Sequence, residues 1–566
     1  MSRSRYPTRL ATILLVGAGV GCQDTVKPGS PEGGVGDITV SYLCGNHFVL
    51  GNQSHRTVTV YYAVLGTSED GELILPASAE NVASTTRLIT LQSGSLQISA
   101  GNEKADPVAH GATACPPPAP TAQPQATLGE WTSPVPWPVV AVHLHLLPSG
   151  RVLSWGRLGP PQVYDPGTGT FREVPSSTMV FCSGHTFLPD GRLLVSGGHL
   201  DDRRGLPDAN VFDDVAQSWL PAQPMSQARW YPTNTTLANG EILALAGTDE
   251  SGDEVEIPEV WDGASWRALP GARRALPYYP RTFLAPNGLV FYAGELQQTA
   301  YLDPSGSGSW IQVAHSKHGR RDYGSAVMYA PGKVMILGGS DPPDGTPTNT
   351  AELIDLNNPS PSWRYTGSMV FARRHLNATV LPDGQVLVTG GTSSDGFSDR
   401  SAAVHAAEIW HPATENWTVL APNQVSRVYH SSTLLLPDGR VLHAGSGDGP
   451  GLPRELNAEF FSPPYLFKGP RPAIGDVPAA LGYGRPFFLA TADAGQVVRV
   501  SLIRLPSVTH AFDQSQRFVE LGFRRTAGGL TVQAPESSLV APAGPYLLTI
   551  LNDAGVPSVS RVVRIE

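Results

Sequence analysis

The chain has 566 residues, which is too many for one hydrophobic core and predicts about three domains. Charged residues make up 16%, whereas Gly (60) and Pro (52) are abundant, so the composition favours an all-β protein with many turns. The formal net charge is -10 and no basic cluster follows the first residues, which argues against nucleic acid as a partner.

Residues 1–22 have the pattern of an export signal, with arginines before a short run of apolar and small residues at 11–20. The run is too short to span a bilayer. We therefore expect export, to the periplasm, the medium or the cell surface. Whether Cys22 carries a lipid anchor stays open, because Gly19 stands where a lipidated cysteine usually has Leu three places before it. We expect membrane association only through that anchor.

The four cysteines fall into three groups. Cys22 closes the leader, and Cys44 and Cys115 bracket the next domain, where they are candidates for a disulfide in an oxidising compartment. Cys182 then remains without a partner. A buried free cysteine is a common core residue, so this thiol alone does not indicate chemistry.

Residues 37–115 contain short β-like runs whose spacing predicts a small β-sandwich, the expected strands being 57–62, 73–75, 88–91 and 96–98. A segment rich in Pro, Ala and Thr at 116–128 follows. We expect it to be an extended and fairly stiff linker.

Residues 129–464 repeat a turn followed by an apolar strand, as in Leu188-Pro-Asp-Gly-Arg-Leu-Leu. The spacing of 41 to 55 residues matches a kelch-type blade, so the sequence predicts a seven-bladed β-propeller. Aromatic residues recur with the same period, and we expect the tryptophans among them to pack between blades. The turn glycines of the seven copies are Gly150, Gly191, Gly240, Gly288, Gly332, Gly384 and Gly439.

Residues 465–566 no longer show this repeat. Short runs such as 497–503, 518–521 and 546–550 are typical of strands, and they predict a second sandwich with an immunoglobulin-like fold.

Three residues stand at one offset within the repeat, and a fourth directly precedes one of them. Cys182 and Tyr231 lie six residues before their turn motifs, and Tyr429 and His430 lie seven and six before theirs. Equal offsets imply equal radial positions, so these side chains are expected to face one another across the axis. Each residue by itself is more often a core residue. Phenolates together with neutral imidazoles form a tetragonal N,O site that suits copper(II), and a bound dication offsets the cost of ionising a phenol.

Four segments carry a resemblance to a known family: Phe-Cys-Ser-Gly at 181–184, Arg-Trp-Tyr-Pro at 229–232, Arg-Val-Tyr-His-Ser at 427–431 and Thr-His at 509–510. They resemble the active-site segments of the copper radical oxidases, the family of galactose oxidase and glyoxal oxidase. The Trp-Tyr-Pro form is closer to glyoxal oxidase. The similarity extends from about residue 130 to the C-terminus, and the N-terminal sandwich is not the carbohydrate-binding domain of galactose oxidase.

The resemblance implies a redox cofactor in which a thioether bond joins Cys182 to Tyr231. It also implies that Tyr231, His430 and His510 hold Cu(2+) in a plane, with Tyr429 above it as general base. A small aldehyde or primary alcohol would be oxidised, and O2 would be reduced to hydrogen peroxide. Because His510 belongs to the C-terminal domain, the loop at 505–509 must reach the propeller axis, and the two domains should form one rigid unit.

The sequence departs from the family in places. An ungapped comparison puts Asp249 where galactose oxidase stacks a tryptophan on the tyrosine, and Thr392 where that enzyme has a glutamine. Arg320 or Arg321 stands near the position of a substrate arginine. These departures disfavour galactose and favour a small aldehyde, as its hydrate, or a primary alcohol. Four other histidines have no family match and are expected to be structural or close to the pocket: His185, His199, His405 and His443.

A second hypothesis is a non-catalytic kelch propeller that binds a glycan or a protein at the cell surface. In either case we expect a monomer, with a carbohydrate as a possible partner. The five residues Cys182, Tyr231, Tyr429, His430 and His510 favour the oxidase.

Overall fold

A computed structural model describes residues 33–35, 38–44, 47–52, 56–65, 70–75, 85–90, 95–100, 103–104, 124–449 and 452–566. The chain divides into two compact units, residues 1–121 and 122–566. The leader with Cys22, the side chain of Cys44, and Cys115 lie outside the described residues, as do residues 116–123 of the predicted linker. The export signal and the disulfide therefore stay predictions.

The first unit contains two four-stranded sheets that enclose a small apolar core, which includes Val40, Phe48 and Leu50. This arrangement matches the small β-sandwich predicted for the N-terminal region. One sheet comprises β1 (Gly33–Val35), β2 (Ile38–Cys44), β3 (His47–Asn52) and β6 (Thr85–Thr90), and the other comprises β5 (Asp70–Leu75), β4 (Val58–Leu65), β7 (Ser95–Ala100) and β8 (Glu103–Lys104).

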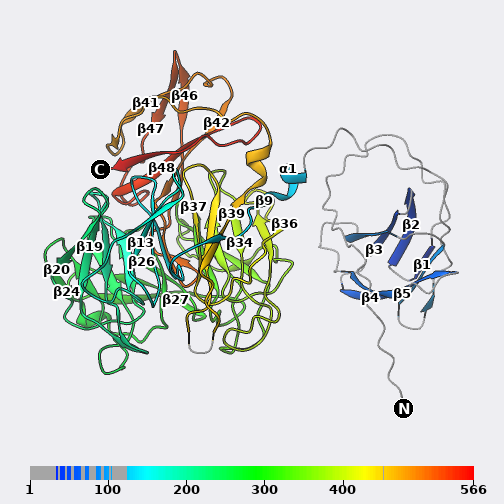
Figure 1. Ribbon diagram of the computed structural model, residues 1–566, viewed down its shortest axis with the longest axis horizontal. Coiled ribbons are helices and arrows are strands. Elements are labelled where there is room, and N and C mark those ends of the chain that lie inside the picture. The colour runs from blue at the N-terminus through cyan, green and yellow to red at the C-terminus, as the bar shows by residue number, and fades with distance from the viewer. Residues whose placement is uncertain are drawn as a thin grey trace. The chain divides into compact units, whose positions relative to one another are not determined.

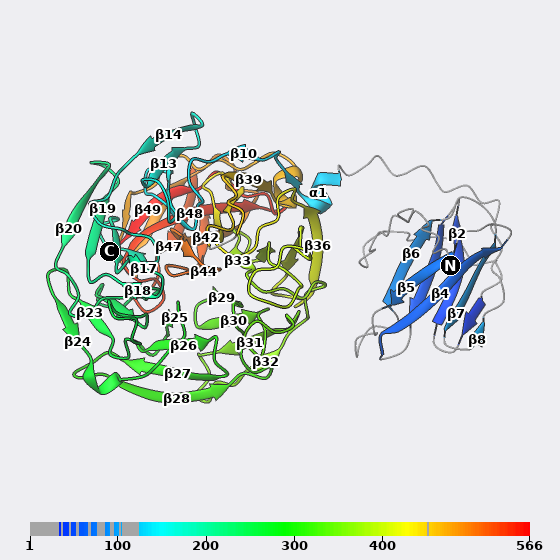
Figure 2. The same ribbon diagram turned by 60° about the horizontal axis from the view of Figure 1, so that its bottom comes forward.

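The second unit begins with α1 (Pro124–Leu128), so the end of the predicted linker is helical rather than extended. Within the described residues, seven antiparallel sheets then form a ring around a central axis (Figure 2), which confirms the seven-bladed propeller. Blade I is β11–β14 (His143–Leu146, Val152–Trp155, Gln162–Asp165, Thr170–Glu173). Blade II is β15, β16, β19 and β20 (Gly184–Phe187, Leu193–Ser196, Ala209–Asp213, Ser218–Ala222).

The next four blades are each built from four consecutive strands. Blade III is β21–β24 (Thr233–Thr236, Ile242–Leu245, Glu259–Trp261, Trp266–Ala268) and blade IV is β25–β28 (Arg281–Leu284, Val290–Gly294, Gln298–Asp303, Ser309–His315). Blade V is β29–β32 (Ser325–Ala330, Lys333–Leu337, Ala351–Asp355, Arg364–Tyr365) and blade VI is β33–β36 (Asn377–Val380, Val386–Thr389, Ala406–Trp410, Trp417–Pro422). Shorter elements between blades are β17 (His199–Asp201), β18 (Arg204–Gly205) and the 3-10 helix η1 (Pro270–Ala272).

Blade VII closes the ring with strands from both ends of the propeller. Its inner strands β37 (Ser431–Leu435), β38 (Val441–Gly445) and β39 (Asn457–Ser462) come from the end of the repeat. Its outer edge is supplied by β9 (Glu130–Trp131) and β10 (Val135–Pro136), which pair with β39. The pairing ties the first propeller residues to the last, so the ring has no free junction.

The outer-strand tryptophans pack between blades, as expected. The Nε1–H of Trp219 donates to the Val174 carbonyl of the preceding connection at 2.8 Å. Trp266 and Trp310 make the same bond to the carbonyls of Gln223 and Ala272. A repeated side-chain-to-backbone bond of this kind fixes the angle between neighbouring blades.

The C-terminal domain lies against one face of the propeller (orange to red in Figure 1) and follows η2 (Pro464–Phe467). It is a sandwich of a five-stranded and a three-stranded sheet around its own core. Ser501 and Arg504 donate to the carbonyls of Pro382 and Phe187 at the turn ends of two blades. Its strands are β40 (Ala480–Leu481), β49 (Arg561–Ile565), β48 (Gly544–Asn552), β42 (Val497–Arg504) and β45 (Phe518–Leu521), with β41 (Pro486–Ala490), β47 (Gly529–Gln533) and β46 (Phe523–Thr526).

One hairpin of this domain leaves the sandwich and joins the propeller. Its strands are β43 (Ser507–Thr509) and β44 (Phe512–Asp513), and β43 pairs with β11, the innermost strand of blade I. The predicted loop toward the axis therefore exists, as a β-strand that extends a blade inward. No helix of the described residues is long and apolar enough to cross a membrane.

Candidate metal centre

Each blade of the propeller has one equivalent residue near the start of its innermost strand. The turn motif lies at the other end of that strand. This residue stands nine places before each turn glycine. All but the first have a positive φ, between 47° and 66°, a conformation that non-glycine residues adopt rarely and mainly at functional sites. In blade order they are Ala141, Cys182, Tyr231, Tyr279, Tyr323, His375 and His430.

A buried ion pair holds several of these positions in place. In blade III, Arg229 lies two residues before Tyr231, pairs with Glu259 at 3.1 Å and donates to the Ala246 carbonyl. The same buried ion pair recurs in blades V, VI and VII as Arg321–Glu352, Arg373–Glu408 and Arg427–Glu459. Because these guanidinium groups bond carbonyls as well as carboxylates, they tie the connection before each inner strand to its own blade.

The hairpin of the C-terminal domain brings His510 to the same place. Thr509 pairs with His143 of β11, and His510 follows at the tip with a φ of 45°. Its Nε2 lies 2.9 Å from the Tyr231 hydroxyl. The imidazole is only 4% exposed, so the side chain is held inside the protein rather than in solvent.

The predicted oxygen and nitrogen donors converge on the Tyr231 hydroxyl. The Tyr429 hydroxyl lies 2.7 Å from it and the Nε2 of His430 lies 3.3 Å from it. Two metal–ligand bonds of about 2 Å at a right angle place their donor atoms about 2.8 Å apart. The observed separations therefore fit a single metal ion bound by His430, His510 and the two phenols.

Both imidazoles are oriented by a bond from the nitrogen that faces away from the centre. The Nδ1 of His430 donates to the Gly447 carbonyl at 2.5 Å, and the Nδ1 of His510 lies 2.7 Å from the Thr509 hydroxyl. Burial lowers the pKa of His430 to about 3 and that of His510 well below its usual value. Both rings are therefore neutral near pH 7, and because the Nδ1 of His430 carries its proton, the Nε2 lone pair of that ring is directed to the centre.

The two phenols favour a site that contains a cation. Burial raises the pKa of both Tyr231 and Tyr429 well above the ordinary value for tyrosine. A phenolate is thus costly here without a metal and becomes favourable beside a dication. In the described residues no three His, Cys, Asp or Glu side chains are arranged to bind a metal, so a metal at this place would need the phenols as part of its ligand set. Two phenolates and two imidazoles form a mixed nitrogen and oxygen ligand set that suits copper(II). Harder ions prefer carboxylate ligands instead.

Cys182 lies against this centre. Its thiol is buried and packs in one cluster with Phe181, Trp230 and Tyr231. The Tyr231 side chain is close enough to hydrogen-bond the thiol, although burial still raises the pKa of Cys182 well above its usual value. The Cys182 carbonyl also accepts the Tyr231 N–H at 2.8 Å. The sulfur and the phenol predicted to be linked are therefore direct neighbours.

Trp230 stacks on the Tyr231 ring, with 3.7 Å between ring centroids and an angle of 6° between the planes. Asp249, at the position compared with the stacking tryptophan of galactose oxidase, instead accepts backbone N–H bonds within its own turn. The ungapped comparison therefore missed the stacking residue, which is the direct neighbour of Tyr231 in the sequence. The Trp230 Nε1–H donates to the Nδ1 of His199 at 3.0 Å, so this histidine lies beside the centre.

A pocket of about 350 Å³ opens onto Tyr231 and His510. Tyr279 forms part of its wall, stacks on His510 at a centroid distance of 4.6 Å and donates to the Ser183 carbonyl. Tyr323 forms another part, with its ring 5.7 Å from that of Tyr429. Sequence reasoning did not identify these two tyrosines. The offset of nine residues from the turn glycine would have found both.

The remaining predicted residues have mixed positions. Arg320 lines the pocket and pairs with Glu295, whereas Arg321 is buried and forms an ion pair with Glu352. Three others lie away from the donor atoms. Thr392 is buried and forms an isolated β-bridge with Arg374, His405 bonds the Asn423 carbonyl, and His443 is buried in blade VII.

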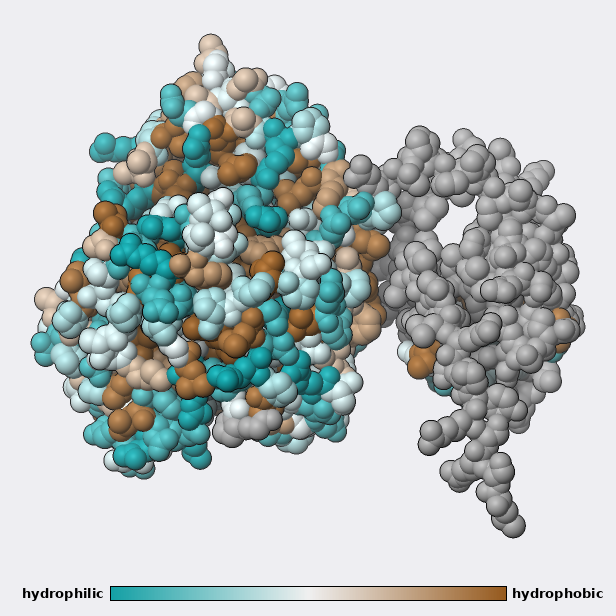
Figure 3. All heavy atoms as spheres, viewed as in Figure 1, coloured by the Kyte–Doolittle hydropathy of each residue, from teal (hydrophilic) through white to brown (hydrophobic). Residues whose placement is uncertain are grey.

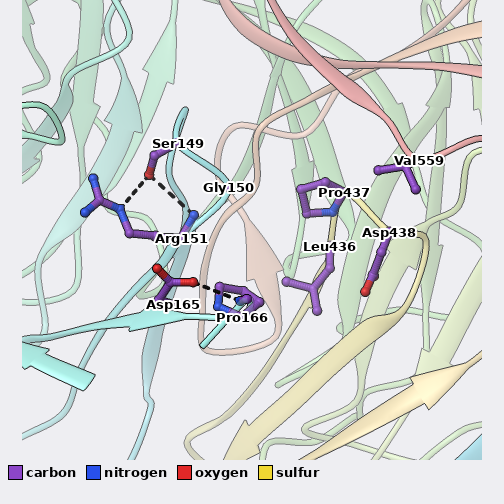
Figure 4. Close-up of a pocket in the computed structure, with 10 residues that line it drawn as sticks. Ser149, Gly150, Arg151, Asp165, Pro166, Leu436, Pro437, Asp438 and Val559 are labelled. Atoms are coloured by element: carbon purple, nitrogen blue, oxygen red, sulfur yellow. Dashed lines mark hydrogen bonds between the residues drawn. The ribbon is translucent and has the colours of Figure 1, made fainter. Parts of the chain in front are cut away.

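Another pocket, of about 360 Å³, lies at the turn end of blades I and VII (Figure 4). It is lined by residues such as Ser149, Arg151 and Asp438, and Arg151 is already paired with Asp214. It contains none of the five predicted site residues. On the face in Figure 3, apolar side chains are scattered among hydrophilic ones. Of these two pockets in the described part of the chain, the one at Tyr231 combines space with reactive groups.

Comparisons with known proteins agree with this geometry. Residues 343–465 match the glyoxal oxidase N-terminus family, and residues 471–565 match the galactose oxidase-like early set domain. A galactose oxidase of Gibberella zeae is 30% identical over 492 residues, which cover 78% of this chain and 71% of that protein. The aldehyde oxidase GLOX of Vitis pseudoreticulata is 29% identical over 469 residues, 75% of this chain and 89% of that protein.

A solved structure is also similar. It is described as a novel fungal alcohol oxidase with catalytic diversity among the AA5 family, in complex with copper. The match has a TM-score of 0.71 and 27% identity, and covers 78% of this chain and all of that one. Together these relatives favour the enzymatic hypothesis over a non-catalytic binding propeller.

Proposed function

Because the chain belongs to the copper radical oxidase family of galactose oxidase and glyoxal oxidase, and is a copper-dependent oxidoreductase that uses O2, we propose that it oxidises small primary alcohols or aldehyde hydrates. The single observation that carries this proposal is the convergence of Tyr429, His430 and His510 on the Tyr231 hydroxyl. We further propose that Cys182 and Tyr231 are joined by a thioether and act as a one-electron redox cofactor.

The residues divide the work as follows. Tyr231, His430 and His510 would hold the copper ion, and the Tyr429 oxygen, which is 2.7 Å from that of Tyr231, would act as the general base. Tyr429 takes the proton of the substrate hydroxyl, and the oxidised Tyr231 oxygen removes a hydrogen atom from the adjoining carbon. When bound, copper(II) would polarise the substrate hydroxyl and provide the acceptor for the second electron. The substrate loses two protons and two electrons in total, and O2 takes up both pairs to form hydrogen peroxide.

The walls of the pocket support a small polar substrate. Its volume of about 350 Å³ is near the lower end for ligand pockets. Arg320, Glu295 and Asp322 stand along it, and the guanidinium group is paired with both carboxylates. A hydroxylated molecule can bond such paired charges without leaving an ion uncompensated, whereas a large apolar molecule cannot. A carbohydrate hydroxyl remains a possible form of this substrate.

We retain export as part of the proposal, on the pattern of residues 1–22, and lipidation at Cys22 as one form of it. We also retain the monomeric state and the Cys44–Cys115 disulfide. Each rests on the sequence alone.

The first experiment loads copper-free protein with copper(II), exposes it to air and measures three properties. We expect about one copper per chain, the loss of two hydrogen atoms in the intact mass, and strong absorption at long wavelength after oxidation. The same protein should release peroxide from glyoxal, methylglyoxal or a primary alcohol. Copper-loaded, oxidised protein that is inert toward a broad panel of aldehydes and alcohols would contradict the proposed activity.

A second experiment tests the ligand from the C-terminal domain. His510→Ala should weaken copper binding by more than about 100-fold, because even outer-shell partners of metal ligands are worth about 10–100-fold. Affinity is measured by competition with a chelator in the absence of air. His405→Ala is the control, since this histidine bonds only backbone and Ser426 away from the donors. Equal affinity in His510→Ala and wild type would show that the ligand is misassigned.

A further inference from the structure

Three buried histidines next to the centre have no role in the proposed reaction. His143 and His145 lie on β11, and His185 lies on β15 of the next blade. All three are fully buried, and burial lowers the pKa of each, so the rings are neutral.

Two of them form a hydrogen-bonded chain that starts at Cys182. The Cys182 N–H donates to the Nε2 of His143 at 3.1 Å. The Nδ1 of His143 lies 3.0 Å from the Nε2 of His185, and the Nδ1 of His185 lies 2.6 Å from the Ser507 hydroxyl. Ser507 belongs to β43, the strand that carries His510 to the axis.

Donor and acceptor roles in the chain are fixed by its first member. A backbone N–H can only donate, so the Nε2 of His143 must be the unprotonated nitrogen. A neutral ring then carries its proton on Nδ1 and donates it to His185. His185 repeats the pattern and donates to Ser507. All bonds of the chain therefore point in one direction, from the cysteine to the hairpin.

This hydrogen-bonded chain matters because the backbone conformation of Cys182 is unfavourable and has to be held by its neighbours. Its φ of 64° is a left-handed conformation that is unfavourable for a non-glycine residue. Its carbonyl is held by Tyr231 and its N–H by His143. Loss of the second bond would release one side of the peptide without removing any donor atom of the metal centre.

We infer that His143 and His185 are positioning residues that fix the backbone of Cys182 for cross-linking to Tyr231, and that Ser507 makes this depend on the docked hairpin. The inference rests on the proposed function. In the cross-linking step a bond forms between the Cys182 sulfur and a ring carbon beside the Tyr231 hydroxyl. One S–H and one C–H bond break, and two protons and two electrons pass to O2, which leaves as hydrogen peroxide.

His145 provides a matched control. It lies two residues from His143, stacks on Trp155 and packs on His185 at a centroid distance of 4.2 Å. Neither of its ring nitrogens has a hydrogen-bond partner among the described residues. Replacing His145 removes a buried imidazole from the same cluster without breaking the hydrogen bonds that link Cys182, His143, His185 and Ser507.

The experiment follows cross-linking of full-length, copper-free protein after addition of copper(II) in air, by intact mass and by mapping of the linked peptides. His143→Leu should slow the reaction at least about 10-fold, whereas His145→Leu should change it less than about 2-fold. Copper affinity, measured without air, should stay within about 3-fold of wild type in both. Equal slowing in the two variants would overturn the inference, because packing would then be the cause.

A second pair of variants guards against a folding defect in His143→Leu. Glutamine places an oxygen near the position of Nε2 and can still accept the Cys182 N–H, whereas asparagine is too short to reach it. His143→Gln should therefore cross-link within about 3-fold of wild type and His143→Asn should not. Wild-type rates in both would reject the role of His143. No effect of Ser507→Ala would reject the link to the hairpin, and a wild type that never cross-links would reject the proposed cofactor itself.

Discussion

Cys182→Ser should bind copper with nearly wild-type affinity and lose turnover by about 1,000-fold or more, which corresponds to about 4 kcal/mol in activation free energy. The thiol is not among the donor atoms, all of which lie around the Tyr231 hydroxyl. Serine fits the same buried space but cannot form the thioether. The oxidised phenol then lacks its sulfur substituent and the long-wavelength absorption should shift or disappear.

The measurements are copper affinity without air, kcat with a primary alcohol, and the spectrum of oxidised protein. Wild-type protein that has not yet been exposed to copper and air is the matched control, since it has an unlinked cysteine at the same position. Full activity in Cys182→Ser would reject the redox role of the sulfur.

The order of domains and blades could be predicted from the sequence because each blade has a strong local signal. Turn glycines such as Gly191 and Gly240 adopt a positive φ in every repeat, and the period between them exposes the propeller. The closure of blade VII by β9 and β10 could not be predicted in this way. It pairs residues more than three hundred positions apart and has no turn between the strands.

The candidate site was predictable where its residues share an offset. Cys182, Tyr231 and His430 occupy equivalent positions, and the structure brings them together. Tyr279 and Tyr323 share the same offset but lie outside the four segments that resemble the family, so the resemblance does not point to them. The stacking of Trp230 could not be predicted, since neighbouring residues in a regular strand point to opposite faces. The positive φ of Tyr231 removes that alternation.

The contacts between the C-terminal domain and the propeller explain why these two domains form one rigid unit. His510 is held through the pairing of β43 with β11, and the turn ends of the blades are bonded by Ser501 and Arg504. A metal centre tolerates displacements of only a few tenths of an ångström, so a ligand from another domain requires a rigid junction. The inward strand supplies this rigidity with backbone bonds, which a flexible loop would lack.

Tyr429→Phe tests the base, and we expect kcat to fall by about 100- to 10,000-fold, the usual contribution of a positioned general base. The Tyr429 oxygen lies 2.7 Å from that of Tyr231, so its removal takes away the nearest proton acceptor while His430 and His510 still bind the metal. Because Tyr231 and Cys182 are unchanged, the thioether should still form. Turnover should therefore fail in a protein whose mass and radical spectrum show an intact cofactor.

Tyr465→Phe is the matched control for Tyr429→Phe. Tyr465 is also a buried phenol with one hydrogen bond, to the Gly439 carbonyl at 2.6 Å, but it lies at the turn end of blade VII. Its replacement should cost about 1 kcal/mol of stability and leave kcat unchanged. If Tyr429→Phe kept wild-type kcat, the proton would have to leave by another group, and Tyr323, whose ring packs against Tyr429 in the pocket wall, is the next phenol to test.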